Sequence, residues 1–583
     1  MNNYQLSEKF NEMAVMCEYA GENIFKARAF SKAAEAIASL DYELYEAEGD
    51  FEIAGAGKGV KEIISDFLNS GASESYEKLR RTVPADLFLM LNISGIGVKK
   101  LKTLCETLQI NKIEDLLAKA ESGKVRQVKG FSAAGEANII DEIKRIQSEK
   151  NSKLYFIAER LFYDTARSLK HIEAVLDVVP AGELARKLPV IKKISCAVIY
   201  SPAFDSESVC AMIAEKLGLV GCQTIHEGGL SVLTARSASS GSLLDFFLVR
   251  SGDTEDKIKK ILALSDDYIE SVSPNLLPCA TGSGSADQTA RALERINAIA
   301  VSAEEPDWLN IAPEHSEVLW KKIPPRDLKN IKPFTTDKIK GIFHVHSSYS
   351  DGVDPLETVV FKAREMGLAY IGITDHSKSS PYAGGLDEER LMRQSEEIDR
   401  LNDRYRPFKI FKGIECDILK DGSLDFSDDI LKTLDFVIIS IHSNFKMSES
   451  EMSARLVRAI SNPYVTMLGH MTGRLLTKRK GYALNEELIF QAARKNDVII
   501  ELNSNPYRMD VDYKHFLRLH EMGILISINP DSHSIADAMQ CVNYGVNAVN
   551  LGGMPESHIF NAKTIEEIEM FFNFKKETAG GKL

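Results

Sequence analysis

The stretch GIFHVHSSYSDG, residues 341–352, places two histidines one residue apart at the end of a short apolar run. Side chains on a β-strand alternate between its two faces, so His344 and His346 are expected to point the same way. Two neighbouring imidazoles repel each other once both are protonated, and a shared cation removes that repulsion. A pair of surface or hydrogen-bonded histidines is the alternative that this short fragment leaves open.

Six further apolar runs follow, and five of them also end in His, Asp or Glu. They are YIGITDH (His376), IFKGIECD (Glu415), FVIISIH (His442), YVTMLGH (His470), VIIELNSNP (Asn503) and ILISINPDSH (Asp531 and His533). Apolar runs at regular intervals, each followed by a helical pattern, predict a parallel α/β domain. Because a parallel barrel gathers the C-terminal ends of its strands on one face, the pattern favours metal ligands over scattered histidines.

The candidate ligands are too many for a single ion. They are His344, His346, Asp351, His376, Glu415, His442, His470, Asp531 and His533. Imidazole and carboxylate without thiolate suit zinc, manganese or iron. Two or three such ions lower the pKa of a bridging water and stabilise a leaving alkoxide, which predicts hydrolysis of a phosphate ester. Arg474, in GRLLTKRK just after His470, could clamp a phosphate, and a solvated basic turn is its alternative.

Length and composition limit the remaining possibilities. At 583 residues the chain is too long for one core, and its net charge of −13 confines any DNA contact to small local sites. Eight scattered cysteines without a Cys-x-x-Cys pair exclude a zinc ribbon and suit a reducing cytoplasm. No apolar run is long enough to span a membrane. We expect helical domains at 1–80 and 81–150, a mixed α/β domain at 151–305, a linker at 306–340 and the metal-binding domain at 341–575.

Three glycine-containing turns separate short helices in the first 150 residues. They are AGAGKGV (Gly55, Gly57 and Lys58), ISGIGVKK (Gly95, Gly97 and Lys99) and VKGFSAAG (Gly130 and Gly135). A Gly-x-Gly turn lets the amides at a helix N-terminus approach a phosphate, whereas the same glycines could merely end helices. Two good copies and one weak copy favour helix-hairpin-helix binding of the DNA backbone.

The C-terminal motifs resemble those of a PHP (polymerase and histidinol phosphatase) domain, in the version fused to bacterial family X DNA polymerases. They are HVHSSYSDG, ITDHSKS, GIECDILKDGSLDF, SIHSNF, GHMTGRLL, ELNSNPYRMD and NPDSH. The resemblance implies a distorted seven-stranded (β/α) barrel with a trinuclear site. By motif, the first metal takes His344, His346, Glu415 and Asp531, the second Glu415, His442 and His470, and the third Asp351, His376 and His533. Of these, Glu415, His442 and Asp531, together with Arg474, are the residues that we expect to carry the chemistry.

The resemblance also extends to the front of the chain. GENIFKARAFSKAAEAI is similar to the opening of the family X lyase-like domain, in which Lys26, Arg28 and Lys32 could meet a DNA 5′ end. One solvated helix face is the alternative for these three residues. In polymerase-linked members the resemblance implies a manganese-dependent 3′→5′ exonuclease, with AP-endonuclease and 3′-phosphatase activities.

The polymerase core is where the chain departs from the family. In AGELARKLPVIKKISCAVIYS, Glu183 aligns with the family serine, and Ile194 and Cys196 align with the two aspartates of Asp-x-Asp. Asp245, in LLDFFLV, keeps the place of the third carboxylate. One carboxylate cannot hold two magnesium ions with a nucleoside triphosphate, so we expect a degenerate palm and thumb without polymerase activity.

These features together predict a cytoplasmic, metal-dependent DNA-processing phosphoesterase that acts in DNA repair. The helix-hairpin-helix turns would present gapped, nicked or abasic DNA to the barrel. The alternatives are a small-molecule phosphoesterase of the histidinol phosphatase type, a noncatalytic scaffold that binds DNA ends, and an active gap-filling polymerase with a PHP nuclease.

Overall fold

A computed structural model describes residues 3–38, 44, 53, 57–93, 95–149, 152–227, 230–238, 241–252 and 333–580. Gly55, the predicted mixed domain beyond residue 252 and the predicted linker up to residue 332 lie outside this described part. Residues 1–150 and 151–583 form two compact units. Among the described residues, none of the helices combines the length and the apolar character needed to cross a membrane.

The described part of the N-terminal unit contains helices and no strands, and it has one apolar core that extends from Leu6 to Ile146. Its helices are α1 (Asn3–Ala20), α2 (Ile24–Ala38), α3 (Lys58–Ser70), α4 (Glu74–Arg80), α5 (Leu87–Leu91), α6 (Val98–Leu108), α7 (Ile113–Glu121) and α8 (Ala133–Glu149). The buried residues of α3 recur at intervals of three and four, as expected for a helix with one face on the core. The predicted boundary at residue 80 therefore does not separate two cores.

The second unit begins with a five-stranded mixed sheet in the order β2-β4-β7-β6-β5. Its strands are β2 (Val175–Ala181), β4 (Ile194–Tyr200), β5 (Leu219–Glu227), β6 (Leu230–Ser237) and β7 (Leu243–Arg250). Helices α9 (Tyr155–Leu169), α10 (Gly182–Ala185) and α11 (Ser206–Leu217) complete it, with a short pair of strands, β1 (Lys153–Leu154) and β3 (Val190–Ile191). Strands β4 and β7 run parallel, so the segments of Cys196 and Asp245 are neighbours, as the predicted palm requires.

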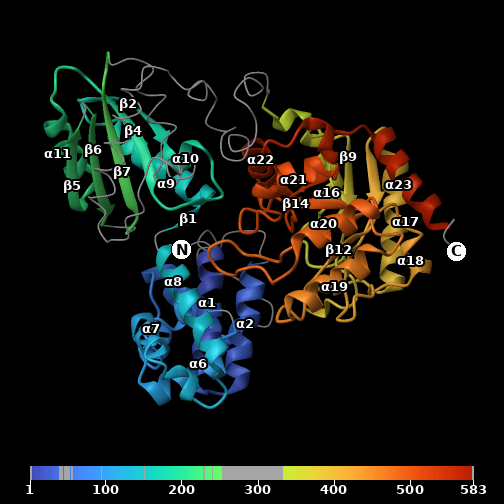
Figure 1. Ribbon diagram of the computed structural model, residues 1–583, viewed down its shortest axis with the longest axis horizontal. Helices are drawn as coiled ribbons and strands as arrows, with labels where there is room; N and C mark the ends of the chain where they lie inside the picture. Colours follow the sequence, from blue (N-terminus) through green and yellow to red (C-terminus); the bar gives the residue numbers. More distant parts are fainter. Residues whose placement is uncertain are drawn as a thin grey trace. The chain divides into compact units, whose positions relative to one another are not determined.

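The C-terminal domain is a parallel barrel whose strands lie inside a ring of helices (Figure 1). Its strands are β8 (Gly341–Ile342), β9 (Tyr370–Ile373), β10 (Lys409–Lys412), β11 (Glu415–Asp417), β12 (Ile438–Ser440), β13 (Met467–Leu468), β14 (Ile499–Asn503) and β15 (Ile526–Asn529). They form two sheets, β10-β9-β8 and β11-β12-β13-β14-β15. Isolated parallel bridges join His376 to Glu415 and Val345 to Ser532, and these bridges close the ring.

The predicted strand IFKGIECD is split into β10 and β11 at Gly413. A Cβ atom at Gly413 would lie 2.4 Å from the ring of Phe436, and one at Gly372 would lie 2.6 Å from the same ring. Phe436 belongs to an aromatic cluster with Phe343 and Phe411 that fills the barrel interior. Glycine at both positions thus leaves room for the ring of Phe436, while the strand pairing is interrupted only at Gly413 and not at Gly372.

The helices of the barrel are α16 (Leu356–Glu365), α17 (Glu388–Tyr405), α18 (Asp428–Leu431), α19 (Glu449–Ile460), α20 (Glu486–Lys495), α21 (Phe516–Glu521), α22 (Ile535–Gly552) and α23 (Ile565–Gly580). The domain begins before residue 341, because buried Phe334 donates its backbone N–H to Asn550 Oδ1 at 2.9 Å. Residues 333–340, predicted as linker, thus pack on α22. Helix α23 also continues beyond the predicted end at residue 575.

Candidate active site

The structure brings the nine predicted metal ligands together at the C-terminal ends of the barrel strands. His344 and His346 follow β8, Asp351 lies in the next loop, His376 follows β9, Glu415 begins β11, His442 follows β12, His470 follows β13, and Asp531 and His533 follow β15. The rings of His344 and His346 lie 5.2 Å apart on either side of the bridged residue Val345. The alternation predicted for this first strand therefore places both imidazoles in one cluster.

Glu415 lies at the centre of the cluster. Its Oε1 atom is 2.9 Å from His470 Nε2 and 3.3 Å from the Nε2 atoms of both His344 and His442. Its Oε2 atom faces the other side, 2.9 Å from His376 Nδ1. A carboxylate whose two oxygens each face imidazole nitrogens is placed to bridge two cations.

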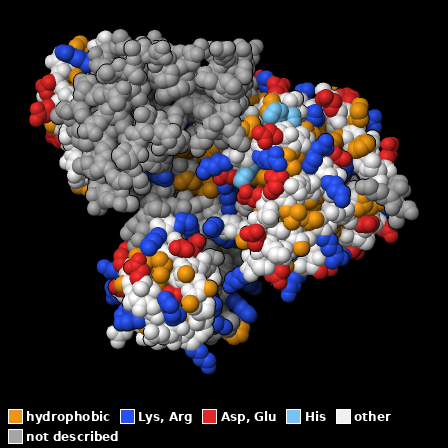
Figure 2. All heavy atoms as spheres, viewed as in Figure 1, with side chains coloured by type: hydrophobic (Ala, Val, Ile, Leu, Met, Phe, Trp, Pro, Cys, Tyr) orange, Lys and Arg blue, Asp and Glu red, His pale blue; other side chains and the backbone are white. Residues whose placement is uncertain are grey.

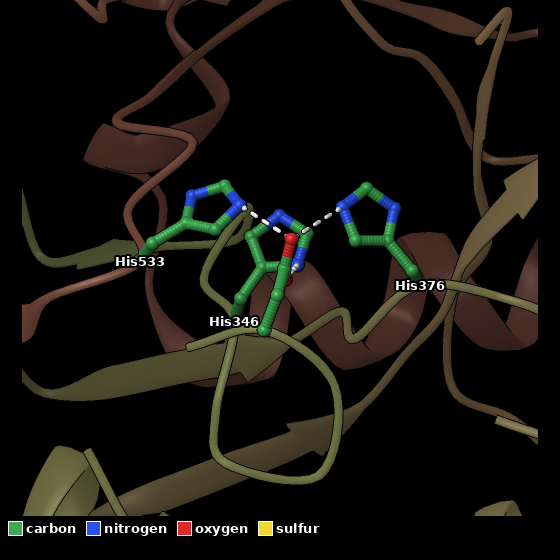
Figure 3. A group of neighbouring side chains, drawn as sticks. His346, His376 and His533 are labelled. Atoms are coloured by element: carbon green, nitrogen blue, oxygen red, sulfur yellow. Dashed lines mark ion pairs between the residues drawn. The ribbon is translucent and has the colours of Figure 1, made fainter. Parts of the chain in front are cut away.

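The donor atoms form three overlapping groups, each compact enough to hold one ion. They are His344, His346 and Asp531; His376, Glu415 and His442; and His346, Asp351, His376 and His533. Figure 3 shows His346, His376 and His533 of the last group gathered around one carboxylate. The Oδ2 atom of Asp351 is 3.3 Å from His533 Nε2 and 3.6 Å from His376 Nε2. The groups share His346 and His376, whereas the family pattern gives each histidine to one metal.

Several buried atoms of the cluster lack a hydrogen bond, and this favours cations as their partners. His344 Nε2, His346 Nδ1, His376 Nδ1 and Glu415 Oε2 are buried without one, because the close contacts of Glu415 with His376 and His344 do not have hydrogen-bond geometry. A buried polar atom without a partner costs roughly 1–3 kcal/mol, so several in one place need an explanation. Neutral imidazole and carboxylate are donors that zinc, manganese and iron accept. The residues present therefore fit a site for several divalent ions.

The protonation preferences of the cluster follow from its burial and its charges. Burial alone raises the pKa of Glu415, but His442, His344 and His376 outweigh that effect and hold the pKa well below its usual range. Burial lowers the pKa of His346 to about 3, and the neighbouring imidazoles lower it further. An ionised carboxylate and a neutral imidazole are the forms in which these groups bind metal ions.

Two buried carboxylates that the sequence analysis did not identify hold the ligands in place. Glu501 Oε1 lies 2.6 Å from His344 Nδ1, and its Oε2 atom accepts the backbone N–H of His470 at 2.7 Å. Asp417 Oδ1 lies 2.9 Å from His442 Nδ1. Such contacts direct the other ring nitrogen toward the cluster. A glutamate inside the apolar run VIIELN was the available signal for Glu501.

The loop that carries Asp351 is fixed by a third buried carboxylate, that of Asp375. It accepts hydrogen bonds from the backbone N–H groups of Ser347 and Ser350 at 2.8 and 3.0 Å and from both hydroxyl groups at 2.6 and 2.5 Å. Gln394 Nε2 donates a further bond at 2.5 Å. Asp375 thereby links the turn before Asp351 to the strand end that carries His376.

Arg474 is not free to clamp a phosphate in the way that the sequence predicts. Its Nη1 donates to Asp512 Oδ2 at 2.7 Å, its Nε to the Arg508 carbonyl at 3.0 Å and its Nη2 to the Met509 carbonyl. Arg508, which the sequence analysis missed, lies closer to the cluster, with its Nε 3.2 Å from Asp531 Oδ2. Arg474 therefore braces the loop that presents Arg508.

Comparison with known proteins now identifies the family. The family described as "PHP domain" matches residues 343–505, "Helix-hairpin-helix domain" matches 1–73, and "SAM-like Helix-hairpin-helix tandem" matches 87–145. The chain is 30% identical to "DNA polymerase/3'-5' exonuclease PolX" of Bacillus subtilis, over 96% of this chain and 97% of that protein. The chain belongs to the bacterial PolX family, family X polymerase-like proteins with a PHP domain.

Other relatives resemble the PolX-family barrel alone. A "Probable phosphatase" of Caldanaerobacter subterraneus subsp. tengcongensis is 25% identical over 42% of this chain and 96% of its own length. A "Probable phosphatase" of Caldicellulosiruptor bescii is 30% identical over 34% of this chain and 81% of its own length. The PHP barrel thus also occurs in proteins whose length corresponds to this domain alone.

Two helix-hairpin-helix turns present uncapped helix N-termini. Gly57 is the N-cap residue of α3 and Gly97 that of α6, and neither helix has a side-chain cap. A Cβ atom at either glycine would meet no heavy atom within 4 Å, and both φ angles are negative. The fold itself therefore does not require glycine at these positions. A ligand that approaches the free amides would require it, as a phosphate does.

The other residues predicted to contact DNA, the remaining glycines and the lysines of the turns, do not all have the same structural role. Gly95 has a φ of +86°, so this glycine shapes the turn itself, whereas Gly55 lies outside the described residues. Lys58 and Lys99 are exposed beside the two helix N-termini. At the third turn the Ser132 hydroxyl accepts the Gly135 N–H at 3.1 Å, so the chain caps this helix itself. Figure 2 shows Lys and Arg side chains intermixed with Asp and Glu, which agrees with local rather than broad basic surfaces.

In the mixed sheet that corresponds to the predicted palm, the buried carboxylate of Asp245 is already paired. Asp245 is 5% exposed, accepts the Thr234 hydroxyl at 2.8 Å and lies 3.1 Å from Lys193 Nζ. Asp245 is paired in register with Ser195 on the parallel strand β4. The ammonium group of Lys193 thus provides the positive charge beside the carboxylate where an active palm holds a metal ion.

The alignment of Ile194 and Cys196 with the family aspartates is wrong by one residue. Side chains paired across adjacent strands point to the same face, so Ser195 and Ala197 share the face of Asp245. Ile194 and Cys196 point to the other face and belong to the apolar core. The error arose because strand register is not visible in an apolar run. Neither Ser195 nor Ala197 is a carboxylate, so the corrected face still lacks the Asp-x-Asp pair.

Proposed function

We propose that the protein is a metal-dependent DNA phosphoesterase, of the 3′→5′ exonuclease, AP-endonuclease or 3′-phosphatase type, that acts in DNA repair in the cytoplasm. The observation that carries the proposal is the position of Glu415, whose two oxygens lie 2.9–3.3 Å from imidazole nitrogens of His344, His376, His442 and His470. The name of the Bacillus subtilis relative supports exonuclease chemistry.

The proposed site holds two or three manganese or zinc ions, with iron as a further candidate. The nine ligands are His344, His346, Asp351, His376, Glu415, His442, His470, Asp531 and His533. When bound, such ions supply Lewis acidity for the attack of water on phosphorus and for departure of the alkoxide. Glu415 bridges two ions, and Glu501 and Asp417 hold the imidazoles of His344 and His442 in their binding orientation.

Arg508 takes the role that the sequence suggested for Arg474. Its guanidinium is oriented through Nε by Asp531, and the described residues provide no partner for its two Nη atoms. A guanidinium with two free N–H groups binds two oxygens of one phosphate. Arg508 thus binds the phosphate to be cleaved, and Arg474 keeps its loop in place.

The DNA duplex is held by the first two glycine turns of the N-terminal unit. The proposed contacts are Gly55, Gly57, Lys58, Gly95, Gly97 and Lys99. Uncapped helix N-termini and open space at Gly57 and Gly97 support this assignment. The substrates are then duplex ends, gaps, nicks or abasic sites rather than free metabolites.

Polymerase activity is lost in this proposal. Two magnesium ions and a triphosphate need three carboxylates close together on one face, and the strand next to Asp245 offers Ser195 and Ala197 in place of the Asp-x-Asp pair. The Lys193 ammonium at 3.1 Å further disfavours a cation at Asp245.

The test uses purified full-length protein with Mn²⁺ on 3′-labelled gapped, nicked and abasic duplexes, with and without nucleoside triphosphates. Shortening from the 3′ end, cutting at the abasic site and release of a 3′-phosphate separate the three activities. Activity in the wild type and its loss in Glu415→Ala are expected. Absence of all three activities in the metal-loaded wild type would reject the proposal.

A second candidate is a small-molecule phosphatase, which the matches of the barrel alone to "Probable phosphatase" proteins favour. The two reactions separate in one competition experiment. Excess unlabelled gapped duplex should inhibit hydrolysis of a chromogenic phosphate monoester if DNA is the substrate. Monoester turnover that the duplex does not affect would favour the small-molecule reaction.

A further inference from the structure

One edge of the metal site carries basic side chains that the proposed chemistry does not use. The segment from Met471 to Leu484 includes Arg474, Lys478, Arg479 and Lys480 and contains no Asp or Glu. The chain as a whole has a net charge of −13. In such a chain, a basic segment next to a site rich in carboxylates favours a separate anionic ligand for this segment.

Hydrogen bonds place this segment beside the metal ligands. Gly473 donates its N–H to the His470 carbonyl at 2.8 Å, and Leu476 donates its N–H to the Tyr507 carbonyl at 2.6 Å. The next residue, Arg508, contacts the predicted ligand Asp531. The segment therefore begins at one metal ligand and is fixed to a loop that reaches another.

Arg474 is paired with Asp512 and Arg508 with Asp531, and the other cations of this edge have no carboxylate partner among the described residues. We name Lys446, Lys478, Arg479, Lys480 and Arg508 the basic rim. Lys446, Lys478, Arg479 and Lys480 are exposed. Lys478 Nζ lies 5.8 Å from the centre of the Tyr507 ring. Cations left without anions at an active-site edge are positioned for an anionic ligand.

Aromatic rings support the rim. Phe445, just after the loop of His442, stacks on Tyr482 with ring centres 5.9 Å apart and an interplanar angle of 22°. The guanidinium of Arg479 lies 4.8 Å from the centre of the Phe445 ring and donates to the Gly473 carbonyl at 2.8 Å. Burial and the charge of Arg508 both lower the pKa of Arg479, so the two guanidinium groups repel each other until an anion lies between them.

We propose that the basic rim binds the sugar-phosphate backbone of a single DNA strand and leads its 3′ end to the metal site. This inference rests on the proposed function and specifies its substrate. A free phosphate monoester would occupy Arg508 and the metal ligands alone and would leave Lys446, Lys478 and Lys480 without a role. Consecutive phosphates of a strand give each of these cations a partner, and the half-buried rings of Phe445 and Tyr507 beside them suit the sugars and bases.

The test compares the double variant Lys478→Ala/Lys480→Ala with Lys495→Ala in the full-length protein. Lys495 is an exposed lysine at the C-terminal end of α20, next to the start of β14 and therefore at the opposite end of the barrel. The probe is a fluorescent single-stranded oligonucleotide with phosphorothioate linkages at its 3′ end, which slow hydrolysis. Binding is measured at several salt concentrations, and hydrolysis of normal DNA and of p-nitrophenyl phosphate is measured in parallel.

The double variant should reduce the slope of log affinity against log salt by about 1.4, because each lost phosphate contact on a single strand contributes about 0.7. Its kcat/KM for DNA should fall through KM, while hydrolysis of p-nitrophenyl phosphate and the Lys495→Ala slope stay at wild-type values. An unchanged slope in the double variant would overturn the inference, and so would an equal loss on p-nitrophenyl phosphate. If the double variant shows the expected reduction in slope but the wild type does not cleave DNA, the inference about the rim is supported and the proposed function is rejected.

Discussion

The substitution Gly97→Asp should weaken DNA binding without lowering the stability of the fold. Aspartate is a better N-cap than glycine by a few tenths of a kcal/mol, and the negative φ and open surroundings of Gly97 accept a side chain. Gly97→Asp should therefore fold at least as stably as the wild type. The same carboxylate lies where a DNA phosphate would approach the free amides of α6.

The expected loss of affinity follows from two contributions. The attraction between a helix N-terminus and a phosphate, about 0.3–1 kcal/mol, is lost because the new carboxylate takes the free amides. Repulsion between two unit charges about 4 Å apart in water adds roughly 1 kcal/mol. The sum is about 1.3–2 kcal/mol, or roughly a 9–30-fold weaker Kd. Gly57→Asp should behave alike, and the two effects should add because the turns are separate.

The assay is fluorescence anisotropy on a gapped duplex at fixed salt, with thermal unfolding measured for each variant. Ser132→Asp is the matched control, since it places the same charge at the N-terminus of α8, where Ser132 already caps the helix. We expect the control to change Kd less than twofold. Wild-type affinity in Gly97→Asp, with an unchanged Tm, would refute DNA binding by this turn. An equal loss in Ser132→Asp would refute the distinction between the turns.

Three further outcomes test the metal site and the palm. After Mn²⁺ reconstitution, elemental analysis should give at least two ions per chain for the wild type and fewer for Glu415→Ala, and less than one ion in the wild type would contradict a multinuclear site. Arg508→Ala should lower kcat/KM by about a hundredfold with little change in Tm, as expected for one lost charge-stabilising contact, whereas Arg474→Ala should mainly lower Tm in thermal unfolding. Neither wild type nor Lys193→Ala should extend a primer across a one-nucleotide gap. Template-directed incorporation that survives Glu415→Ala but is lost in Asp245→Ala would prove the palm active.

The barrel could be predicted because its strands are separate apolar runs with ligands at their ends. The split of IFKGIECD at Gly413 could not, since the packing around this glycine involves the ring of Phe436, which is distant in sequence. The start of the domain was also missed. Residues 333–340 look polar and linker-like, and only the contact of Phe334 with Asn550 shows that they belong to the barrel.

Some of the site residues could likewise be predicted from the sequence, and others could not. Ligands at strand ends, such as His442 and His470, carry a signal in the sequence, because few other roles explain a histidine there. Glu501 and Asp375 act through other side chains, and no spacing rule marks such residues. Arg474 and Arg508 are both arginines in loops after strands, and only the carbonyl and carboxylate partners of Arg474 show which of the two is occupied.

The proposed loss of polymerase activity is compatible with a stable polymerase-like sheet, because Asp245 has partners within the chain. A buried aspartate alone, without ions or partners, would be costly, and Asp245 is instead neutralised by Lys193 and hydrogen-bonded by Thr234. The carboxylate is therefore stable without a metal ion, and the sheet keeps its fold without the rest of the catalytic set. A cation supplied by the chain makes magnesium binding at this point unfavourable, because the ion would have to displace the ammonium group and then find two more carboxylates that Ser195 and Ala197 do not offer.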